Sequence, residues 1–242
     1  AGGRLITKSY YHIGVAVDTE RGLMVPVVRD VDRKSVRELA SEVGDLADIT
    51  DLEAFRKQQQ DGKGPKLTVT AFALKAVAIA LKEFPHFNAS LDLAAGQLVT
   101  KRYYHLGLAV DTERGLLVPV LHDVDRKSVF DLATEMGELA ERARQKKLTG
   151  DEMRGGTFTI TNLGGIGGTA FTPIINYPEV AILGLSRSRL QPVVREGQIV
   201  PRLLLPLSLS YDHRVIDGAA AARFVRRLVE MLENPLVMLL HA

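Results

Sequence analysis

The sequence predicts an α/β fold of two layers, with a mixed β-sheet and a layer of helices. Segments rich in β-branched and aromatic residues alternate along the chain with segments whose apolar residues recur every three or four positions. These patterns are typical of strands and of amphipathic helices, respectively. Short turns between some of the strand-like segments favour antiparallel hairpins within the sheet. With 242 residues, 46% of them hydrophobic, the chain is long enough to bury a full core.

The composition excludes several classes of function. Lys and Arg number 31 against 29 Asp and Glu, a net charge of +2, which gives no electrostatic indication of nucleic-acid or membrane binding. The chain has no cysteine, so disulfides, thiolate metal sites and a cysteine nucleophile are excluded. It also lacks an apolar run long enough to span a membrane and a signal-peptide pattern at its start. We therefore expect a cytoplasmic location, or the mitochondrial matrix in a eukaryote.

The N-terminal part of the chain is nearly copied further along. Residues 5–47 recur as residues 98–140, and 31 of these 43 positions are identical. In the first copy, residues 10–17 and 23–28 are predicted strands separated by a short turn, and a helix is expected to follow. Two copies are too few for a solenoid. We interpret the repeat as a duplication or an engineered splice rather than as two active sites.

Five helices are predicted from apolar periodicity and from their end signals. Thr50 and Glu53 have the spacing of a capping box at the start of one helix. Pro85 ends another, which is strongly apolar. The predicted helices cover residues 36–46, 50–60, 68–84, 128–146 and 218–232.

The C-terminal half contains further predicted strands. They are separated by a glycine-rich loop and by short turns. Pro235 ends the last helix, and an apolar tail follows it. The predicted strands cover residues 156–162, 180–185, 193–195, 199–201 and 203–211.

His213 is the strongest catalytic candidate among the six histidines. It lies between a predicted strand and a predicted helix, a corner that presents a side chain to a cleft. A neutral imidazole can accept a proton from a thiol or hydroxyl near pH 7, and Asp212, Arg214 and Asp217 supply charges that could orient it. His105, by contrast, lies in a strand-like run and is interpreted as a packed, hydrogen-bonded residue. The histidines lack the spacing of a metal site, so no metal is expected.

Residues 155–184 form a second group of candidates. Four glycines at 164, 165, 167 and 168 permit close backbone approach to a ligand or to another chain. Their spacing does not match a dinucleotide-binding or triphosphate-binding motif. Thr161, at the end of a predicted strand, could donate its hydroxyl to a developing oxyanion, although a structural role is the alternative.

Taken together, these residues resemble a known family. His213 to Gly218 (HRVIDG) matches the HxxxDG signature of the dihydrolipoamide acyltransferases, the E2 components of 2-oxo-acid dehydrogenase complexes, which chloramphenicol acetyltransferases share. Residues 157–184 resemble the second motif of that family. The resemblance extends from about Asp48 to the C-terminus and implies the two-layer mixed-sheet fold of that family.

The resemblance implies acyl transfer between coenzyme A and the dihydrolipoyl group of the complex. His213 corresponds to the general base, and Thr161 stands where the family commonly has the serine that stabilises the oxyanion. Asp217 corresponds to a structural carboxylate that holds the site by ion pairing. The segment AFTPIINYPEVAILG is most similar to acetyl-transferring members from pyruvate dehydrogenase complexes. The residues that contact coenzyme A are not assigned.

The family forms homotrimers that assemble into cubic or icosahedral cores, with active sites between subunits. The resemblance therefore implies that Thr161 and His213 meet across an interface and that the apolar residues 236–240 serve assembly. The E1 and E3 components would bind through domains outside this chain. We expect residues 1–47 to replace the family's N-terminal arm and to form one compact domain with the catalytic core, 48–242. A cage-forming scaffold without catalysis and a small-molecule O-acetyltransferase are the alternatives.

Overall fold

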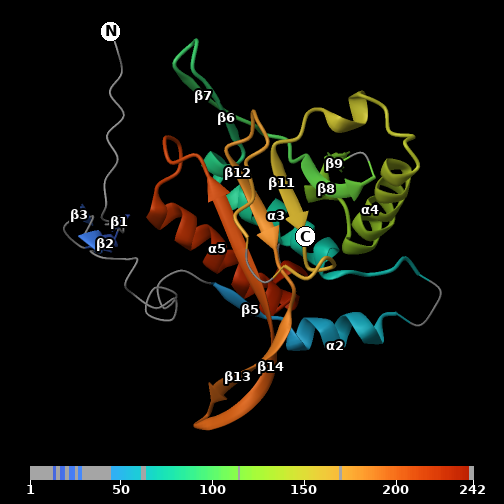
Figure 1. Cartoon of the computed structure of the whole chain (residues 1–242), viewed down its shortest axis with the longest axis vertical. Helices are drawn as coiled ribbons and strands as arrows, with labels where there is room; N and C mark the ends of the chain where they lie inside the picture. The colour runs from blue at the N-terminus through green and yellow to red at the C-terminus, as the bar shows by residue number, and fades with distance from the viewer. Residues whose placement is uncertain are drawn as a thin grey trace. The chain divides into compact units, whose positions relative to one another are not determined.

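The structure is a computed structural model that describes residues 45–60, 64–113, 115–168 and 171–239, and the backbone of four short strands nearer the N-terminus (Figure 1). The chain divides into two units, residues 1–44 and 45–242, and each is described by itself. In the first unit, β1 (Ile13–Gly14) pairs with β4 (Val27–Val28), and β2 (Val17–Thr19) pairs with β3 (Gly22–Met24), both antiparallel.

These short strands fall within or beside the two predicted for the first copy of the repeat. The helix predicted over residues 36–46 lies outside the described residues, except at its end. There the prediction is wrong, because Leu46 begins a strand, β5 (Leu46–Asp48), which pairs with a strand from the far end of the chain. The compact domain expected of residues 1–47 and 48–242 stays a prediction.

The second unit is built on a mixed sheet with the strand order β10–β8–β11–β12–β14–β13. The central strands β8, β11 and β12 run parallel, and β14 runs antiparallel to β12. Two further strands join this path, because β5 pairs with β14 and β9 pairs with β8. The strands are β8 (Leu106–Thr112), β9 (Gly115–Leu117), β10 (Val120–Leu121), β11 (Phe158–Asn162), β12 (Ala181–Leu185), β13 (Arg189–Arg195) and β14 (Gln198–Tyr211).

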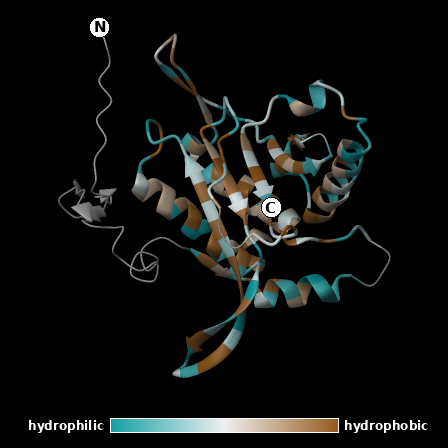
Figure 2. Cartoon of the chain, viewed as in Figure 1, coloured by the Kyte–Doolittle hydropathy of each residue, from teal (hydrophilic) through white to brown (hydrophobic). Residues whose placement is uncertain are grey.

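Helices form the second layer, as predicted. In α3 (Val69–Glu83), most residues are buried, and it contacts both α4 (Val129–Arg144) and α5 (Gly218–Glu233). Apolar side chains of the sheet and the helices make up one core (Figure 2). Phe87 and Phe224 stack in this core with ring centroids 4.1 Å apart. The exposed hairpin of β6 (Ala89–Asp92) and β7 (Gln97–Thr100) was not predicted. The remaining elements are α2 (Thr50–Gln58), α6 (Leu236–Leu239) and three short 3-10 helices, η3 (Pro85–Phe87), η4 (Val124–Arg126) and η5 (Asp151–Met153).

The capping box predicted at Thr50 does not form. The helix α2 begins at Thr50 with Ile49 as its N-cap, and no side chain caps it. The Thr50 hydroxyl donates instead to Asp48 Oδ1 over 2.7 Å and accepts a hydrogen bond from the backbone N–H of Leu203. Thr50 thus links the helix to β14. By contrast, Ser128 and Asp131 form a full capping box at the start of α4.

The C-terminal strands are longer than predicted. Residues 199–201 and 203–211 belong to one continuous strand, β14, and its first half pairs with β13 in a two-stranded ribbon. The ribbon extends away from the helices in Figure 1. Among the described residues, no helix has the length and apolar character needed to cross a membrane.

Candidate active site

His213 lies in the turn that joins β14 to α5. The backbone N–H of Asp212 donates to the carbonyl of Val180 over 2.8 Å and so ties the turn to the start of β12. The N–H groups of Val215 and Ile216 donate to the carbonyl of Asp212, which closes the turn. His213 is exposed, and its ring contacts that of Tyr211 with centroids 5.6 Å apart. The imidazole is therefore accessible to a substrate.

The charged neighbours of His213 are engaged elsewhere. Asp212 and Arg214 bind each other, with Arg214 Nη2 2.6 Å from Asp212 Oδ2, and the hydrogen bond from Arg214 is the main cause that lowers the pKa of Asp212. Asp217 is the N-cap of α5 and accepts a hydrogen bond from the N–H of Ala220 over 2.7 Å. Within the described part of the chain, Asp217 forms no ion pair. Its visible contribution is to fix where the helix begins, directly after the His213 turn.

Thr161 lies in β11 at the centre of the sheet, with Ala109 of β8 on one side and Gly184 of β12 on the other. Only 7% of its surface is exposed. The Phe171 ring lies against Gly184, where an added Cβ would come within 2.7 Å of the ring. The hydroxyl of Thr161 forms no hydrogen bond to the residues that the structure describes. It is therefore available to donate to a ligand.

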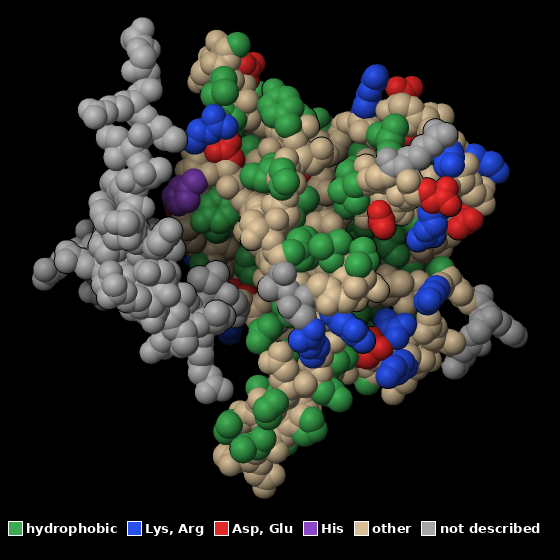
Figure 3. All heavy atoms as spheres, viewed as in Figure 1, with side chains coloured by type: hydrophobic (Ala, Val, Ile, Leu, Met, Phe, Trp, Pro, Cys, Tyr) green, Lys and Arg blue, Asp and Glu red, His purple; other side chains and the backbone are tan. Residues whose placement is uncertain are grey.

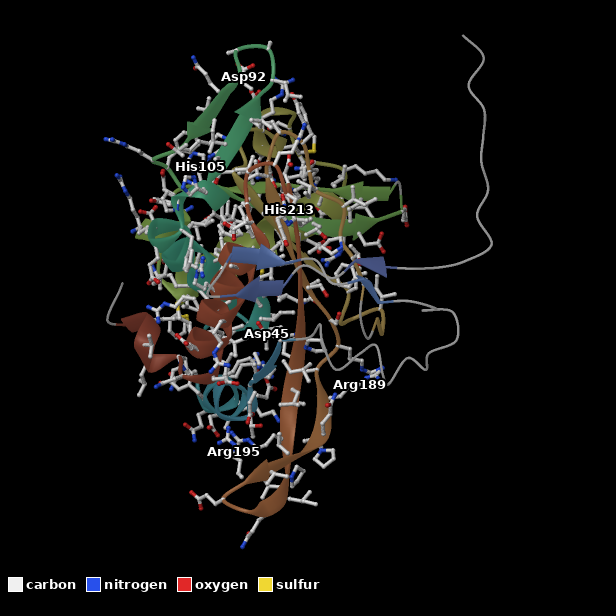
Figure 4. All side chains as sticks on the ribbon, turned by 90° about the vertical axis from the view of Figure 1, so that its left-hand side faces the viewer. Asp45, Asp92, His105, Arg189, Arg195 and His213 are labelled. Carbon is white, nitrogen blue, oxygen red and sulfur yellow. The ribbon has the colours of Figure 1, made fainter. Side chains whose placement is uncertain are left out.

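One chain does not bring Thr161 and His213 together. Thr161 is level with Gly184, which is level with Ser208 of β14, and His213 comes five residues after Ser208. At about 3.3 Å per residue, they are offset by roughly 16 Å along the strands. Figure 4 shows His213 beyond the opposite end of β14 from Arg195 on the ribbon. The two candidates thus lie at opposite ends of the sheet.

Two cavities lie near the end of β11 that carries Thr161. The larger, about 870 Å³, is lined by residues from the start of α3, from β8 and from α4, and includes Lys66 and Arg144. The smaller, about 270 Å³, includes Gly164 and Gly165 of the glycine-rich loop. Asn162 lines both cavities, and His213 lines neither.

Asn162 organises the entrance to the glycine-rich loop. Its Nδ2 donates to Thr70 Oγ1 of α3 over 2.9 Å, and its Oδ1 accepts from the backbone N–H of Gly164 over 2.8 Å. The loop is thereby fixed to the helix layer directly after Thr161. No pattern in the sequence marks Asn162 for this role, because its partner Thr70 is 92 residues away in the chain.

Glu179 is a buried carboxyl that sequence reasoning also missed. It precedes β12 at the same end of the sheet as His213, and only 6% of its surface is exposed. Burial raises the pKa of Glu179 to about 7, although Thr159, Asn176 and Lys101 act in the opposite direction. Nothing in the amino-acid pattern marks this position, because its burial depends on the pairing of β11 with β12.

The other candidates have simpler explanations. His105 Nδ1 accepts a hydrogen bond from the backbone N–H of Asp123 over 3.0 Å, so the interpretation as a packed histidine is confirmed. Burial is the main cause that lowers the pKa of His105. No group of three or more His, Cys, Asp or Glu in the described ranges could hold a metal ion.

Comparison with known proteins identifies relatives of both units. Residues 1–50 and 45–240 each match the family described as 2-oxoacid dehydrogenases acyltransferase (catalytic domain). The dihydrolipoyllysine-residue acetyltransferase component of the pyruvate dehydrogenase complex from Pseudomonas aeruginosa is 57% identical over 199 residues, 81% of this chain and 36% of that protein. The Azotobacter vinelandii protein of the same description is 58% identical over 197 residues, 80% of this chain and 31% of that protein. The chain thus spans about a third of the length of these relatives.

Solved structures agree with this result and confirm the predicted fold class. The cubic core of the pyruvate dehydrogenase multienzyme complex matches with a TM-score of 0.79 and 56% identity, over 81% of this chain and 82% of that one. The same values hold for an Azotobacter vinelandii dihydrolipoamide acetyltransferase studied for the roles of a serine, a histidine and an asparagine in its catalytic mechanism. Chloramphenicol acetyltransferase, at 17% identity and a TM-score of 0.52 over 78% of this chain and 86% of that one, shares the fold.

Proposed function

The chain belongs to the family of 2-oxoacid dehydrogenase acyltransferase catalytic domains, and from this we propose that it transfers an acetyl group between coenzyme A and a dihydrolipoyl group of a pyruvate dehydrogenase complex. Relatives of 57% and 58% identity carry that description. The chain spans only part of their length, and we propose that other parts of a longer protein carry the dihydrolipoyl group and bind the E1 and E3 components.

One observation carries the assignment of the reacting groups. In the Azotobacter vinelandii acetyltransferase, the serine precedes the histidine by 52 residues, and the asparagine follows it by four. Thr161, His213 and Asp217 have the same spacing. Thr161 keeps the hydroxyl of the serine, and Asp217 keeps a side-chain oxygen that can cap a helix, as an asparagine does.

The proposed reaction needs no covalent intermediate on the protein. His213 accepts the proton of the attacking thiol, and the sulfur forms a bond to the thioester carbonyl carbon. The carbonyl oxygen becomes an oxyanion, to which the Thr161 hydroxyl donates a hydrogen bond. When the tetrahedral intermediate collapses, the bond to the original sulfur breaks, and that sulfur takes the proton from His213. Both thiols belong to substrates, which fits a chain without cysteine.

This reaction requires a second copy of the chain. The offset of roughly 16 Å between Thr161 and His213 along the strands is too large for both to act on one carbonyl group. We therefore propose that Thr161 of one copy and His213 of another form each site, in a homotrimer that builds a larger core. The match to a cubic core supports such an assembly.

The larger cavity suits the arm of one thiol substrate. Its volume of about 870 Å³ lies within the range for small-molecule sites. Asn162, the residue that follows Thr161 in the chain, lines the cavity. Lys66 and Arg144 in its lining offer positive charge to the phosphates of coenzyme A, although Asp111 and Glu138 also line it. We propose that coenzyme A reaches the reacting centre through this cavity.

The test is acetyl transfer from acetyl-coenzyme A to free dihydrolipoamide. We expect turnover by the parent chain and a loss of about 10²-fold to 10⁴-fold in His213→Ala, the size of a general-base contribution. Transfer to a hydroxyl acceptor but not to dihydrolipoamide would instead identify a small-molecule O-acetyltransferase. A folded, assembled parent without either activity would identify a scaffold.

A further inference from the structure

The turn that carries His213 is fixed to the sheet by the residue that follows Glu179. The backbone N–H of Asp212 donates to the carbonyl of Val180 over 2.8 Å. This bond continues the antiparallel register of β12 and β14 one step beyond their last paired residues. If that register continued, Glu179 would be the residue opposite His213. The place of the turn therefore depends on how residues 179 and 180 are held.

Glu179 lies where an exposed segment enters the core. Residues 176–178 are exposed, whereas Glu179 and Val180 are buried. The backbone N–H of Glu179 donates to the carbonyl of Asn176 over 2.9 Å and closes a turn before β12. The carboxyl lies against the backbone of Gly156, just before β11, where an added Cβ would come within 3.0 Å of Oε1. The Glu179 side chain thus packs the start of β12 against the start of β11.

The Glu179 carboxyl has few hydrogen-bond donors that suit a negative charge. Its Oε1 lies 3.4 Å from Asn176 Nδ2, which is a long hydrogen bond. Its Oε2 is buried and accepts no hydrogen bond from the residues that the structure describes. Burial raises the pKa of Glu179 to about 7, and Thr159 and Asn176 oppose this effect only in part. The packing at this position therefore favours the neutral acid over the carboxylate.

The surroundings of Glu179 supply no close positive charge. Within the described part of the chain, no cation forms an ion pair with this carboxyl, and Lys101 favours the ionised form only through its more distant charge. In the turn after β14, Asp212 and Arg214 pair with each other. Burial lowers the pKa of His105, which lies before β8 at the same end of the sheet, so its imidazole is neutral at pH 7. In Figure 3, apolar and uncharged side chains cover most of the upper centre of the view, where β12 begins in Figure 1. When Glu179 ionises, water or a movement of the chain must therefore satisfy its charge.

We propose that neutral Glu179 is a positioning residue for His213, and that its ionisation shifts the start of β12 and with it the turn that presents the imidazole. The hydrogen bond from Asp212 to Val180 is the link, because a shift of Val180 displaces the turn that this bond fixes. The proposal rests on the proposed function for the role of His213 as the base. It goes beyond it, because it makes activity depend on a buried carboxyl outside the reacting centre.

The first test is the pH dependence of acetyl transfer by the parent and by Glu179→Gln, which keeps the shape of the neutral acid and cannot ionise. The ratio of the two kcat values cancels the titration of His213 and of the substrates, which both proteins share. We expect the ratio of Glu179→Gln to parent to rise from about 1 at pH 6 to about tenfold or more at pH 8.5, where a group with a pKa of about 7 is largely ionised. Glu230→Gln, which removes an exposed carboxyl on α5, is the matched control, and its ratio to the parent should stay constant. A constant ratio for Glu179→Gln would overturn the proposal.

The second test needs no turnover. Hydrogen exchange of a peptide covering residues 207–217 reports on the Asp212 N–H, and a peptide from α3 reports on the core. After correction for the intrinsic pH dependence of exchange, we expect protection of the turn in the parent to fall more than about fivefold between pH 6 and pH 8.5, with a smaller change in α3. In Glu179→Gln, the turn should keep its protection.

The outcomes of the exchange experiment separate a positioning role from a purely structural one. Equal protection of the turn at both pH values in the parent would overturn the proposal. A fall of the same size in the turn and in α3 would also overturn it, because Glu179 would then affect the whole fold. A parent without acetyl transfer whose turn still loses protection at pH 8.5 would contradict the proposed reaction, while supporting the link between Glu179 and the His213 turn.

Discussion

The two candidate site residues, Thr161 and His213, lie in opposite environments at the two ends of the central sheet. Thr161 is buried in the middle strand of the sheet, and its neighbours on both sides belong to regular strands. His213 lies exposed in a turn that three backbone hydrogen bonds around Asp212 hold in place. A rigid strand suits a hydrogen-bond donor that must meet a developing charge without reorganisation. An exposed turn suits a base that must meet a thiol brought by another molecule.

This contrast shows what each end lacks. At the Thr161 end there are cavities but no described histidine lines them. At the His213 end there is an accessible imidazole, but Thr161 lies roughly 16 Å away along the strands. Each end is half of the proposed site.

At the Thr161 end of the sheet, we expect the largest loss of activity from Thr161→Val, which removes the hydroxyl and keeps the β-branched shape. Loss of one oxyanion donor reduces kcat by about 10²-fold to 10³-fold. Thr161→Ser keeps the donor and is the matched control, so it should retain most of the activity. Steady-state kinetics with saturating substrates measure both. Equal activity in Thr161→Val and the parent would show that the hydroxyl does not contact the reacting oxygen.

Co-expression of two inactive variants tests whether Thr161 of one chain and His213 of another form a shared site. His213→Ala and Thr161→Val, each nearly inactive alone, should regain activity when the two chains are expressed together. In an assembly whose sites each draw one residue from two chains, random mixing leaves about a quarter of the sites intact. The activity of the mixture is compared with the summed activities of the separate variants. No gain in mixed assemblies, confirmed as mixed by differential tags, would contradict a shared site.

The buried carboxyl of Glu179, at the His213 end of the sheet, is expected to make the stability of the folded protein depend on pH. Its pKa is raised from 4.5 to about 7 by burial, so the folded state holds the proton more tightly than the unfolded state. Protonated Glu179 therefore stabilises the folded state fully below about pH 4.5, and this stabilisation is lost as the pH rises through about 7. Glu179→Gln removes this loss, and at pH 8 we expect it to raise stability relative to the parent by up to about 3 kcal/mol.

The measurement is denaturant unfolding at pH 5 and pH 8 for the parent and for Glu179→Gln. The difference between the two proteins should be larger at pH 8. Glu230→Gln, which removes an exposed carboxyl on α5, is the control for the loss of one negative charge. A pH-independent difference at Glu179 would mean that the carboxyl is ionised in the folded protein throughout this range.

Local signals in the sequence predicted most of the helices and strands correctly. The helices α3 and α4 begin where the predicted helices start, and in the structure Thr68 and Ser128 cap them, because each accepts a hydrogen bond from a backbone N–H of its own first turn. Thr50 was misassigned because its partners, Asp48 and Leu203, compete for its hydroxyl, and the second is remote in sequence. The ribbon was underestimated because Pro192 and Pro201 suggest breaks, whereas here they lie opposite each other in paired strands.

The candidate residues can be identified from motifs in the sequence, whereas their separation within one chain cannot be read from any local pattern. His213 and Thr161 stand in motifs that can be read directly from the sequence, and the structure places both at strand ends. Their separation follows from the order β11–β12–β14 and from the antiparallel direction of β14, which no local pattern encodes. The burial of Glu179 and the link from Asn162 to Thr70 depend on the same long-range pairing.

The smallest expected effect is at Asp217, near His213, where two variants separate a capping role from an ion-pairing role. If its role is to cap α5, Asp217→Ala should cost about 1 kcal/mol of stability, whereas Asp217→Asn keeps an oxygen that accepts from the N–H of Ala220 and should cost only a few tenths. Activity should follow the same order, because the cap fixes the helix directly after the His213 turn. Unfolding curves and turnover of both variants measure this. Asp217→Asn could instead lose activity as strongly as Asp217→Ala while remaining as stable as the parent. The negative charge itself would then be required for activity, and the ion-pairing role implied by the family resemblance would replace the capping role.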